Sequence, residues 1–210
     1  MKSRSSKKTS AAKAATPTDL QGYEVVVAVC GGIAAYKVCT VVSRLAQRGA
    51  GVTVVMTEAA TKFVTPLTFE SLTLRRVFTS AWESEGYHDP QHLRLTEGAD
   101  LFLVAPCTAN MIGKIAHGIA DDLVSTMVMS TDCPVLLAPA MNTRMWNNPI
   151  VQGNVKTLAK AGYEIIPPAE GWLACRTVGA GRLPEPEQLI NAVTSRLKSR
   201  RPRDLDSQSS

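Results

Sequence analysis

The sequence predicts an α/β protein in which a three-layer, flavodoxin- or Rossmann-like parallel sheet has helices on both faces. Three near-continuous apolar runs, at 24–30, 101–105 and 135–139, are typical of strands that are buried on both sides. Helical segments separate these runs, so the strands are expected to run parallel through right-handed crossovers. Polar or glycine-containing residues follow each run, and ligands bind at this carboxyl edge of such sheets.

The first unit of the chain is a strand, a glycine turn, a helix and a second strand. The strands are expected at 24–30 and 52–56 and the helix at 33–48, with Gly31 and Gly32 in the turn. Backbone N–H groups in such a turn can approach an anion, and the helix N-terminus adds partial positive charge. The unit therefore predicts a phosphate site. The turn lacks the G-x-G-x-x-G spacing, which disfavours NAD.

The middle of the chain is expected to contain a helix at 66–74, a loop at 82–91 and a short helix at 92–98. The strand at 101–105 ends in Pro106-Cys107-Thr108-Ala109-Asn110, which precedes a helix at 111–118. Thr108 can cap that helix, and small polar residues at this edge can equally contact a bound ligand. Asp121 and Asp122 begin a further helix that runs to about residue 130. Paired acids at the start of a helix interact favourably with the helix dipole.

The run at 135–139 leads directly to Ala140, Met141 and Asn142. The side chain of Asn142 has two donors and one acceptor oxygen, so it can cap a helix or bind a carboxylate. A helix at 150–161 and a last strand at 163–166 are expected next. The glycines of 171–182 and the prolines before them indicate a mobile segment and a candidate lid. An amphipathic helix at 184–200 closes the fold.

Composition places the chain among globular proteins and excludes several functional classes. Its net charge of +5 comes from the ends: residues 1–18 hold five Lys or Arg and no acid, and 194–210 hold five and two acids. We expect residues 1–20 and 201–210 to be disordered tails around one domain at 21–200. A mildly acidic domain argues against nucleic acid, and no apolar run reaches the roughly 20 residues of a membrane span. Five cysteines without C-x-x-C spacing argue against a zinc site and favour a reducing cytoplasm.

Three motifs closely resemble those of the homo-oligomeric flavin-containing cysteine decarboxylases. They are the string 31–37, the run 106–110, and Pro139-Ala140-Met141-Asn142 followed by Met145 and Trp146. The resemblance covers roughly 23–193 and implies an FMN cofactor and no metal. It implies cofactor contacts at Gly31, Gly32, Ile33, Thr57, Cys107, Thr108, Ala109, Asn110 and Ala140. It also implies that Asn142, Ala140 and Met145 bind substrate, that His92 is the catalytic base, and that Cys175 donates a proton.

The resemblance further implies the reaction. The flavin would oxidise the thiol of 4'-phosphopantothenoylcysteine to a thioaldehyde, carbon dioxide would leave, and the reduced flavin would return the electrons to give 4'-phosphopantetheine for coenzyme A biosynthesis. A homotrimer or dodecamer is expected. Arg176 departs from the family pattern, which has glycine after the catalytic cysteine and so permits a positive φ there. Two alternatives stay open: a peptidyl-cysteine decarboxylase of the same family, and a flavoprotein regulatory subunit that binds a phosphatase.

Overall fold

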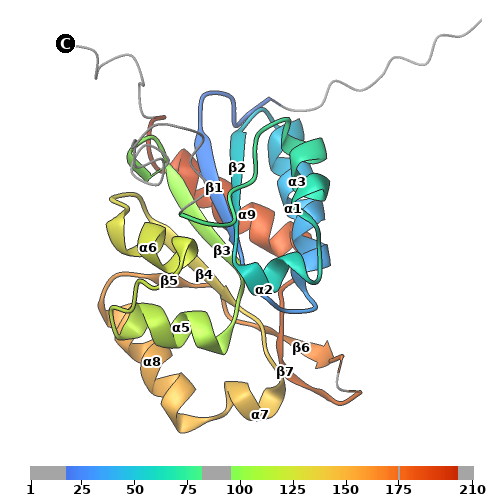
Figure 1. Ribbon diagram of the computed structural model, residues 1–210, viewed down its shortest axis with the longest axis vertical. Helices are drawn as coiled ribbons and strands as arrows, with labels where there is room; N and C mark the ends of the chain where they lie inside the picture. Colours follow the sequence, from blue (N-terminus) through green and yellow to red (C-terminus); the bar gives the residue numbers. More distant parts are fainter. Residues whose placement is uncertain (1–17, 82–95, 175, 203–210) are drawn as a thin grey trace, which may run out of the picture.

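The computed structural model describes residues 18–81, 96–174 and 176–202. Five parallel strands form its main sheet in the order β2-β1-β3-β4-β5 (Figure 1). Their bounds are β1 Glu24–Val29, β2 Gly51–Met56, β3 Leu101–Cys107, β4 Val135–Pro139 and β5 Glu164–Ile165. The connections reverse direction between β1 and β3, which is the switch point of flavodoxin-like sheets. The predicted fold class is confirmed.

Helices cover both faces of this sheet (Figure 1). One face carries α1 (Ala35–Gln47), α3 (Pro66–Thr73) and α9 (Pro186–Lys198), and the other carries α5 (Ala109–Ala116), α6 (Leu123–Ser130) and α8 (Pro149–Lys160). The short helices α2 (Glu58–Thr61) and α7 (Thr143–Trp146) follow directly on β2 and β4. The helices α1, α2, α5 and α7 therefore begin at the carboxyl edge of the sheet.

The two faces of the sheet explain why the central strands are apolar at nearly every position. On β1, Val25 and Val27 pack on the side of α1 and α9, while Val26 and Ala28 pack on the side of α5 and α6. All four side chains are essentially inaccessible to solvent. Alternation along a strand therefore distributes apolar side chains to two cores rather than to a core and the solvent.

The structure corrects one expectation for the C-terminal half. The strand predicted as the last is followed by β6 (Ala169–Trp172) and β7 (Val178–Arg182), which pair antiparallel as a separate two-stranded sheet. The segment predicted as a candidate lid therefore contains a pair of antiparallel strands. Glycine has low strand propensity, so local sequence argued against strands here. The structure also contains α2, a single turn too short to give a periodic signal.

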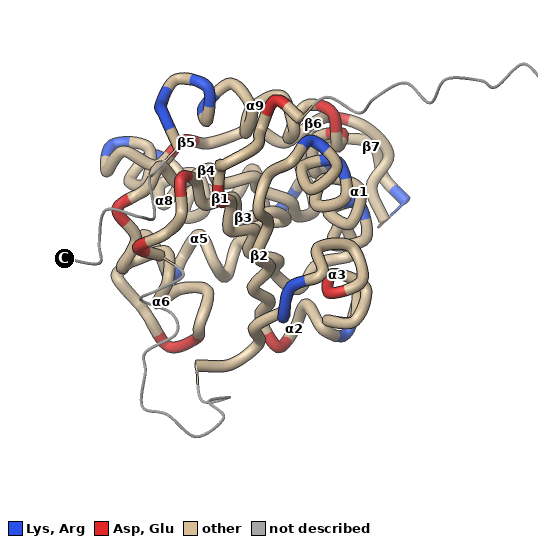
Figure 2. The backbone as a smooth tube through the Cα atoms, turned by 90° about the horizontal axis from the view of Figure 1, so that it is seen from above, with Lys and Arg blue, Asp and Glu red and all other residues tan. Residues whose placement is uncertain are grey.

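Charges in the described residues are dispersed over the fold. In Figure 2, basic and acidic positions are scattered over the described part of the chain and do not gather on one basic face. Several are paired across elements, as where Arg75 binds Glu24 and Arg48 binds Asp19. None of the helices in the described ranges combines the length and the apolar character that crossing a membrane requires.

Candidate active site

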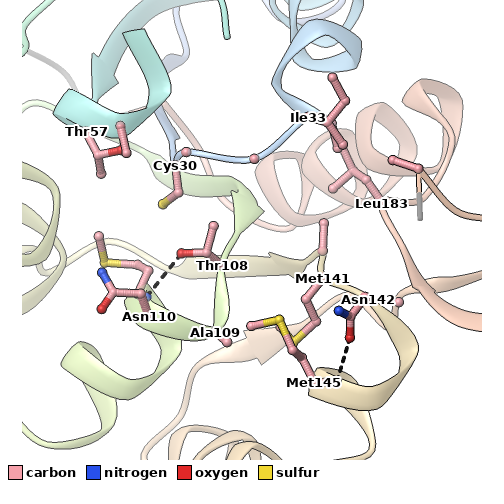
Figure 3. A pocket seen from close by; sticks show the side chains of 18 of the residues that line it. Cys30, Ile33, Thr57, Thr108, Ala109, Asn110, Met141, Asn142, Met145 and Leu183 are labelled. Atoms are coloured by element: carbon pink, nitrogen blue, oxygen red, sulfur yellow. Dashed lines mark hydrogen bonds between the residues drawn. The ribbon is translucent and has the colours of Figure 1, made fainter. Parts of the chain in front are cut away.

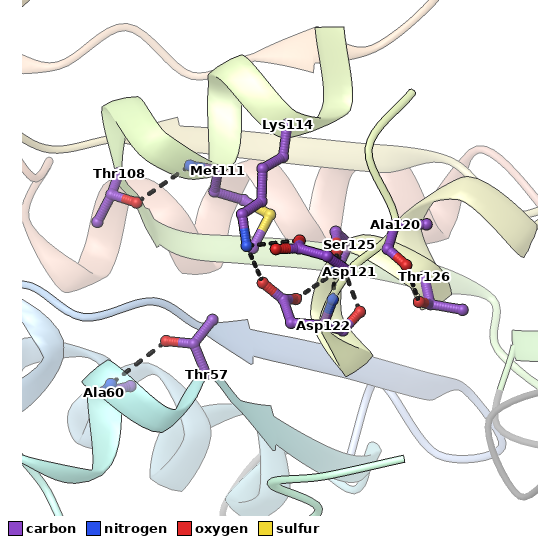
Figure 4. A network of polar contacts seen from close by, with 10 residues as sticks. All are labelled: Thr57, Ala60, Thr108, Met111, Lys114, Ala120, Asp121, Asp122, Ser125 and Thr126. Atoms are coloured by element: carbon purple, nitrogen blue, oxygen red, sulfur yellow. Dashed lines mark hydrogen bonds and ion pairs between the residues drawn. The ribbon is translucent and has the colours of Figure 1, made fainter. Parts of the chain in front are cut away.

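Three neighbouring strands are each followed by a residue that caps the next helix with a side-chain oxygen. Thr57 after β2 accepts from Ala60 N at 3.3 Å, and Thr108 after β3 accepts from Met111 N at 3.3 Å. Figure 4 shows these two caps on facing elements. Asn142, after β4, accepts from Met145 N at 2.8 Å. Capping fixes these side chains at the carboxyl edge, with the positive ends of the helix dipoles close by.

The glycine turn after β1 lies at the same edge. A methyl group on Gly31 would overlap the side chain of Ala59 and lie 2.9 Å from the Ala59 carbonyl carbon, so the turn packs directly against α2. A methyl group on Gly32 would instead make only ordinary van der Waals contact, 3.9 Å from Pro106 and from Thr108. The backbone at Gly32 is therefore exposed to the gap between the two loops, as an approaching phosphate requires.

These loops enclose a cavity of about 1150 Å³ (Figure 3). That volume exceeds the roughly 300–1,000 Å³ of common small-molecule pockets, so a mononucleotide and a second molecule can occupy it together. The structure brings most of the predicted site residues into its lining: Gly31, Gly32, Ile33, Thr57, Thr108, Ala109, Asn110, Ala140, Asn142 and Met145. Residues separated by more than 100 positions in the sequence therefore share one site.

Cys107 is the predicted contact that the structure does not bring into the lining. It is fully buried as the last residue of β3, and its carbonyl oxygen accepts a hydrogen bond from Ala140 N at 3.0 Å. Its role in the described structure is to join the loop after β3 to the loop after β4. Burial raises the pKa of the Cys107 thiol well above its ordinary value, so the thiol stays protonated.

The oxygen of the Asn142 side-chain amide is used in a hydrogen bond within the fold. This Oδ1 atom caps α7 through Met145 N, and this bond fixes which end of the amide is the acceptor. The NH₂ group is left as the donor for a ligand, and Figure 3 shows it turned away from the Met145 amide. Capping and carboxylate binding, which the sequence left as alternatives, are compatible in this geometry.

Charged residues in the lining were not anticipated from the sequence. Lys114 of α5 binds Asp121 at 2.6 Å and Asp122 at 2.7 Å, and all three side chains face the cavity (Figure 4). Across the cavity, Lys37 of α1 and Arg182 at the end of β7 both bind Glu185. Arg182 and Glu185 are three residues apart, whereas the pairs of Lys37 and Lys114 join residues further apart in the sequence, which contains no local signal for them.

Burial and the neighbouring Arg182 lower the pKa of Lys37, in that order of importance. A hydrogen bond from Lys114 lowers the pKa of Asp121, which keeps that carboxylate ionised. The described residues contain no group of three or more His, Cys, Asp or Glu arranged to hold a metal ion. Within the described residues, charge in the cavity lining comes from these two sets of ion pairs and from Glu58.

The two predicted catalytic residues, His92 and Cys175, lie outside the described residues. Among the residues next to them in the sequence, Arg176 is the informative one. Arg176, directly after Cys175, has φ of 62°. The backbone here takes the left-handed conformation for which glycine is suited, although the sequence has arginine in place of the family's glycine.

The fold and the site together define a flavodoxin-like protein whose cavity at the switch point is large enough for a mononucleotide and a second ligand. The flavoprotein family model matches residues 13–198. The bifunctional coenzyme A biosynthesis protein CoaBC of Bacillus subtilis is 46% identical over 171 residues, which are 81% of this chain and 42% of that protein. The chain thus spans less than half the length of this relative.

Solved structures give the same result. A mutant PPC decarboxylase complexed with pantothenoylaminoethenethiol is 31% identical with a TM-score of 0.72, over 81% of this chain and 96% of that one. The FMN-dependent cysteine decarboxylase SpaF is also 31% identical, with a TM-score of 0.74 over 86% and 98%. The chain belongs to the flavoprotein family, and the predicted membership of its cysteine decarboxylase branch is confirmed.

Proposed function

We propose that the protein binds FMN and decarboxylates 4'-phosphopantothenoylcysteine to 4'-phosphopantetheine in coenzyme A biosynthesis. The observation that carries this proposal is the shared cavity of the glycine turn and Asn142. A phosphate-binding element and a carboxylate-binding amide line a space large enough for two ligands. The similarity to CoaBC and to PPC decarboxylase supports this substrate, and the similarity to SpaF supports FMN.

The residues present fit FMN. Gly32 leaves open backbone beside Thr108, and the N-terminus of α1 follows immediately, so these elements would hold the phosphate. Thr108, Ala109 and Asn110 would line the ribityl chain and the ring edge. When bound, FMN supplies the two-electron acceptor that the substrate thiol needs before its carboxylate can leave.

The chain's own residues orient the substrate and move its protons. The Asn142 NH₂ group would donate to the substrate carboxylate, and the apolar side chain of Met145 would lie beside it. His92 is proposed to accept a proton from the substrate, because imidazole titrates near neutral pH. Cys175 is proposed to return a proton to the product through its Sγ atom. The resemblance to the family supports these roles: through the position of His92 before the strand at 101–105, and through the motifs around Asn142 and Cys175.

Carbon dioxide release from 4'-phosphopantothenoylcysteine by the FMN-loaded protein tests the proposal. We expect His92→Asn to abolish release, while Cys175→Ser still releases carbon dioxide but accumulates the oxidised enethiol. His117→Asn is the matched control, because His117 is exposed, bonds to Gly113 O at 2.9 Å and does not line the cavity. A yellow wild-type protein without turnover would favour a regulatory flavoprotein instead.

We also propose that the protein is a cytoplasmic homotrimer or dodecamer. Ile33, Tyr36 and Trp172 line the cavity, yet each exposes more than half of its surface in the single chain. Contact with a second copy would cover these side chains and complete the cavity wall. Light scattering of the purified protein should then give at least three times the mass of 22.5 kDa, whereas a monomer would contradict the assignment.

A further inference from the structure

The hairpin of β6 and β7 contacts the loop that holds Asn142. Met141 N donates a hydrogen bond to Gly181 O at 2.8 Å, and α7 packs against β7 (Figure 1). Asn142 lies between these two contacts, directly after Met141 and directly before α7. The position of its side chain in the cavity is therefore set on one side by the hairpin.

The contact depends on the missing side chain of Gly179. A methyl group there would overlap Thr143 Oγ1 and would lie 3.0 Å from Thr143 Cγ2 and 3.2 Å from Thr143 Cβ. The backbone of Gly179 does not have a positive φ, so alanine would be tolerated by the backbone itself. The obstacle to a side chain is Thr143, the residue after Asn142.

Thr143 contributes little to the fold through its hydroxyl group. Its Oγ1 atom is buried and has no hydrogen-bond partner. Removing a buried unpaired hydroxyl group costs no hydrogen bond, so Thr143→Ala is expected to fold normally. The same substitution removes both side-chain atoms that approach Gly179 most closely.

Gly181 makes a second contact of a different kind. Its φ is 124°, and a methyl group would overlap the Met141 carbonyl oxygen and lie 3.4 Å from the Asn142 carbonyl carbon. These neighbours are backbone atoms, so truncating a side chain cannot make room for the methyl group. Gly179 and Gly181 thus allow β7 to approach the Asn142 loop at two successive inward positions.

We propose that Gly179 and Gly181 are positioning residues that set the place of the Asn142 amide through Thr143 and Met141. A side chain at either position displaces the loop and moves the NH₂ group away from its productive place. The inference rests on the proposed function where it assigns the substrate carboxylate to Asn142. The close approach itself is a property of the fold and is tested separately.

Amide hydrogen exchange of the full, FMN-loaded protein tests the approach without any substrate. The reporters are Met141 N, which donates to Gly181, and Met145 N, which donates to Asn142. We expect Gly179→Ala to speed exchange at both amides by about 10-fold or more, since lost protection of 1.4 kcal/mol gives that factor. Thr143→Ala should exchange as wild type does, and the double variant Gly179→Ala/Thr143→Ala should recover wild-type protection.

Steady-state kinetics test the consequence for the site. We expect Gly179→Ala to lower kcat/KM by about 10-fold, mainly through a higher KM, because the displaced amide binds the carboxylate in the ground state. The kcat/KM of the double variant should return to within about threefold of the wild-type value. FMN content and the unfolding temperature should change little in all three proteins. Gly181→Ala should show the same loss, and adding Thr143→Ala should not repair it.

The inference is overturned if Gly179→Ala leaves both amides protected, or if the double variant is as impaired as Gly179→Ala. A general loss of FMN and of thermal stability in Gly179→Ala would also overturn it, since a positioning residue acts on Asn142 specifically. Absence of carbon dioxide release from the wild-type protein is a different result. It would refute the proposed function and leave the exchange measurement valid.

Discussion

The side-chain oxygen of Asn142 accepts a hydrogen bond from the backbone amide of Met145 at 2.8 Å. One residue thereby begins α7 and presents an amide NH₂ group to the cavity. The bond orients the donor before any ligand arrives, so binding a carboxylate requires no reorganisation of this side chain.

Asn142→Asp separates the two functions of this side chain. A carboxylate oxygen can still cap α7, but it has no donor for the substrate carboxylate and repels it. We expect the variant to fold and to lose carbon dioxide release by on the order of 100-fold. Asn148→Asp is the matched control, because Asn148 caps α8 through Ile150 N at 2.9 Å and lies outside the cavity lining. Equal losses in both variants would contradict the role of Asn142.

Arg176→Gly should stabilise the protein. The left-handed conformation costs an L residue about 1–2 kcal/mol, which exceeds the roughly 0.5–1 kcal/mol of extra chain entropy that glycine loses. We expect the free energy of unfolding in urea to rise by about 0.5–1 kcal/mol. Arg176→Ala keeps the Cβ atom and removes the charge, so it should give no gain. A gain in the alanine variant would show that the guanidinium, and not φ, is the cause.

Asp19 should make stability depend on pH in the acid range. Hydrogen bonds from Arg48 and Lys198 hold the pKa of its carboxyl well below the ordinary 3.8. Because the folded pKa is depressed, the contribution is complete above 3.8 and is lost as the pH falls toward the folded pKa. We expect the free energy of unfolding of the wild-type protein to exceed that of Asp19→Asn by about 1 kcal/mol near neutral pH.

That difference should shrink steadily as the pH falls below 4 in matched urea titrations of the two proteins. Added salt should also reduce it, since all three side chains are partly exposed. A difference in the free energy of unfolding that grows on acidification would have the wrong sign for a depressed pKa and would contradict the proposed effect of Asp19.

The Cys30 thiol should resist alkylation although it lies at the cavity wall. Burial raises its pKa to about 12, so almost none of the reactive thiolate forms at neutral pH. We expect iodoacetamide to leave Cys30 and Cys107 unlabelled in the folded protein and to label both after unfolding, as read by peptide mass spectrometry. Rapid labelling of Cys30 in the folded protein would contradict its burial.

The sequence predicted the main sheet well because burial on both faces leaves continuous apolar runs such as 101–105. It also predicted that Thr108 and Asn142 lie shortly after strand ends, because both follow an apolar run closely in the sequence. The hairpin of β6 and β7 was missed because its glycines allow a close contact with a loop that is distant in the sequence. Local strand propensity does not depend on such a contact. The ion pairs of Lys114 join separate elements and were missed for the same reason. The roles of His92 and Cys175 stay predictions.

The central claim is tested most directly by offering the purified FMN-loaded protein two substrates at equal concentration. One is 4'-phosphopantothenoylcysteine and the other is a peptide with a C-terminal cysteine. We predict carbon dioxide release and formation of 4'-phosphopantetheine from the first, and little or no release from the second. Preferential release from the peptide, or a protein that neither contains FMN nor takes it up, would contradict the account.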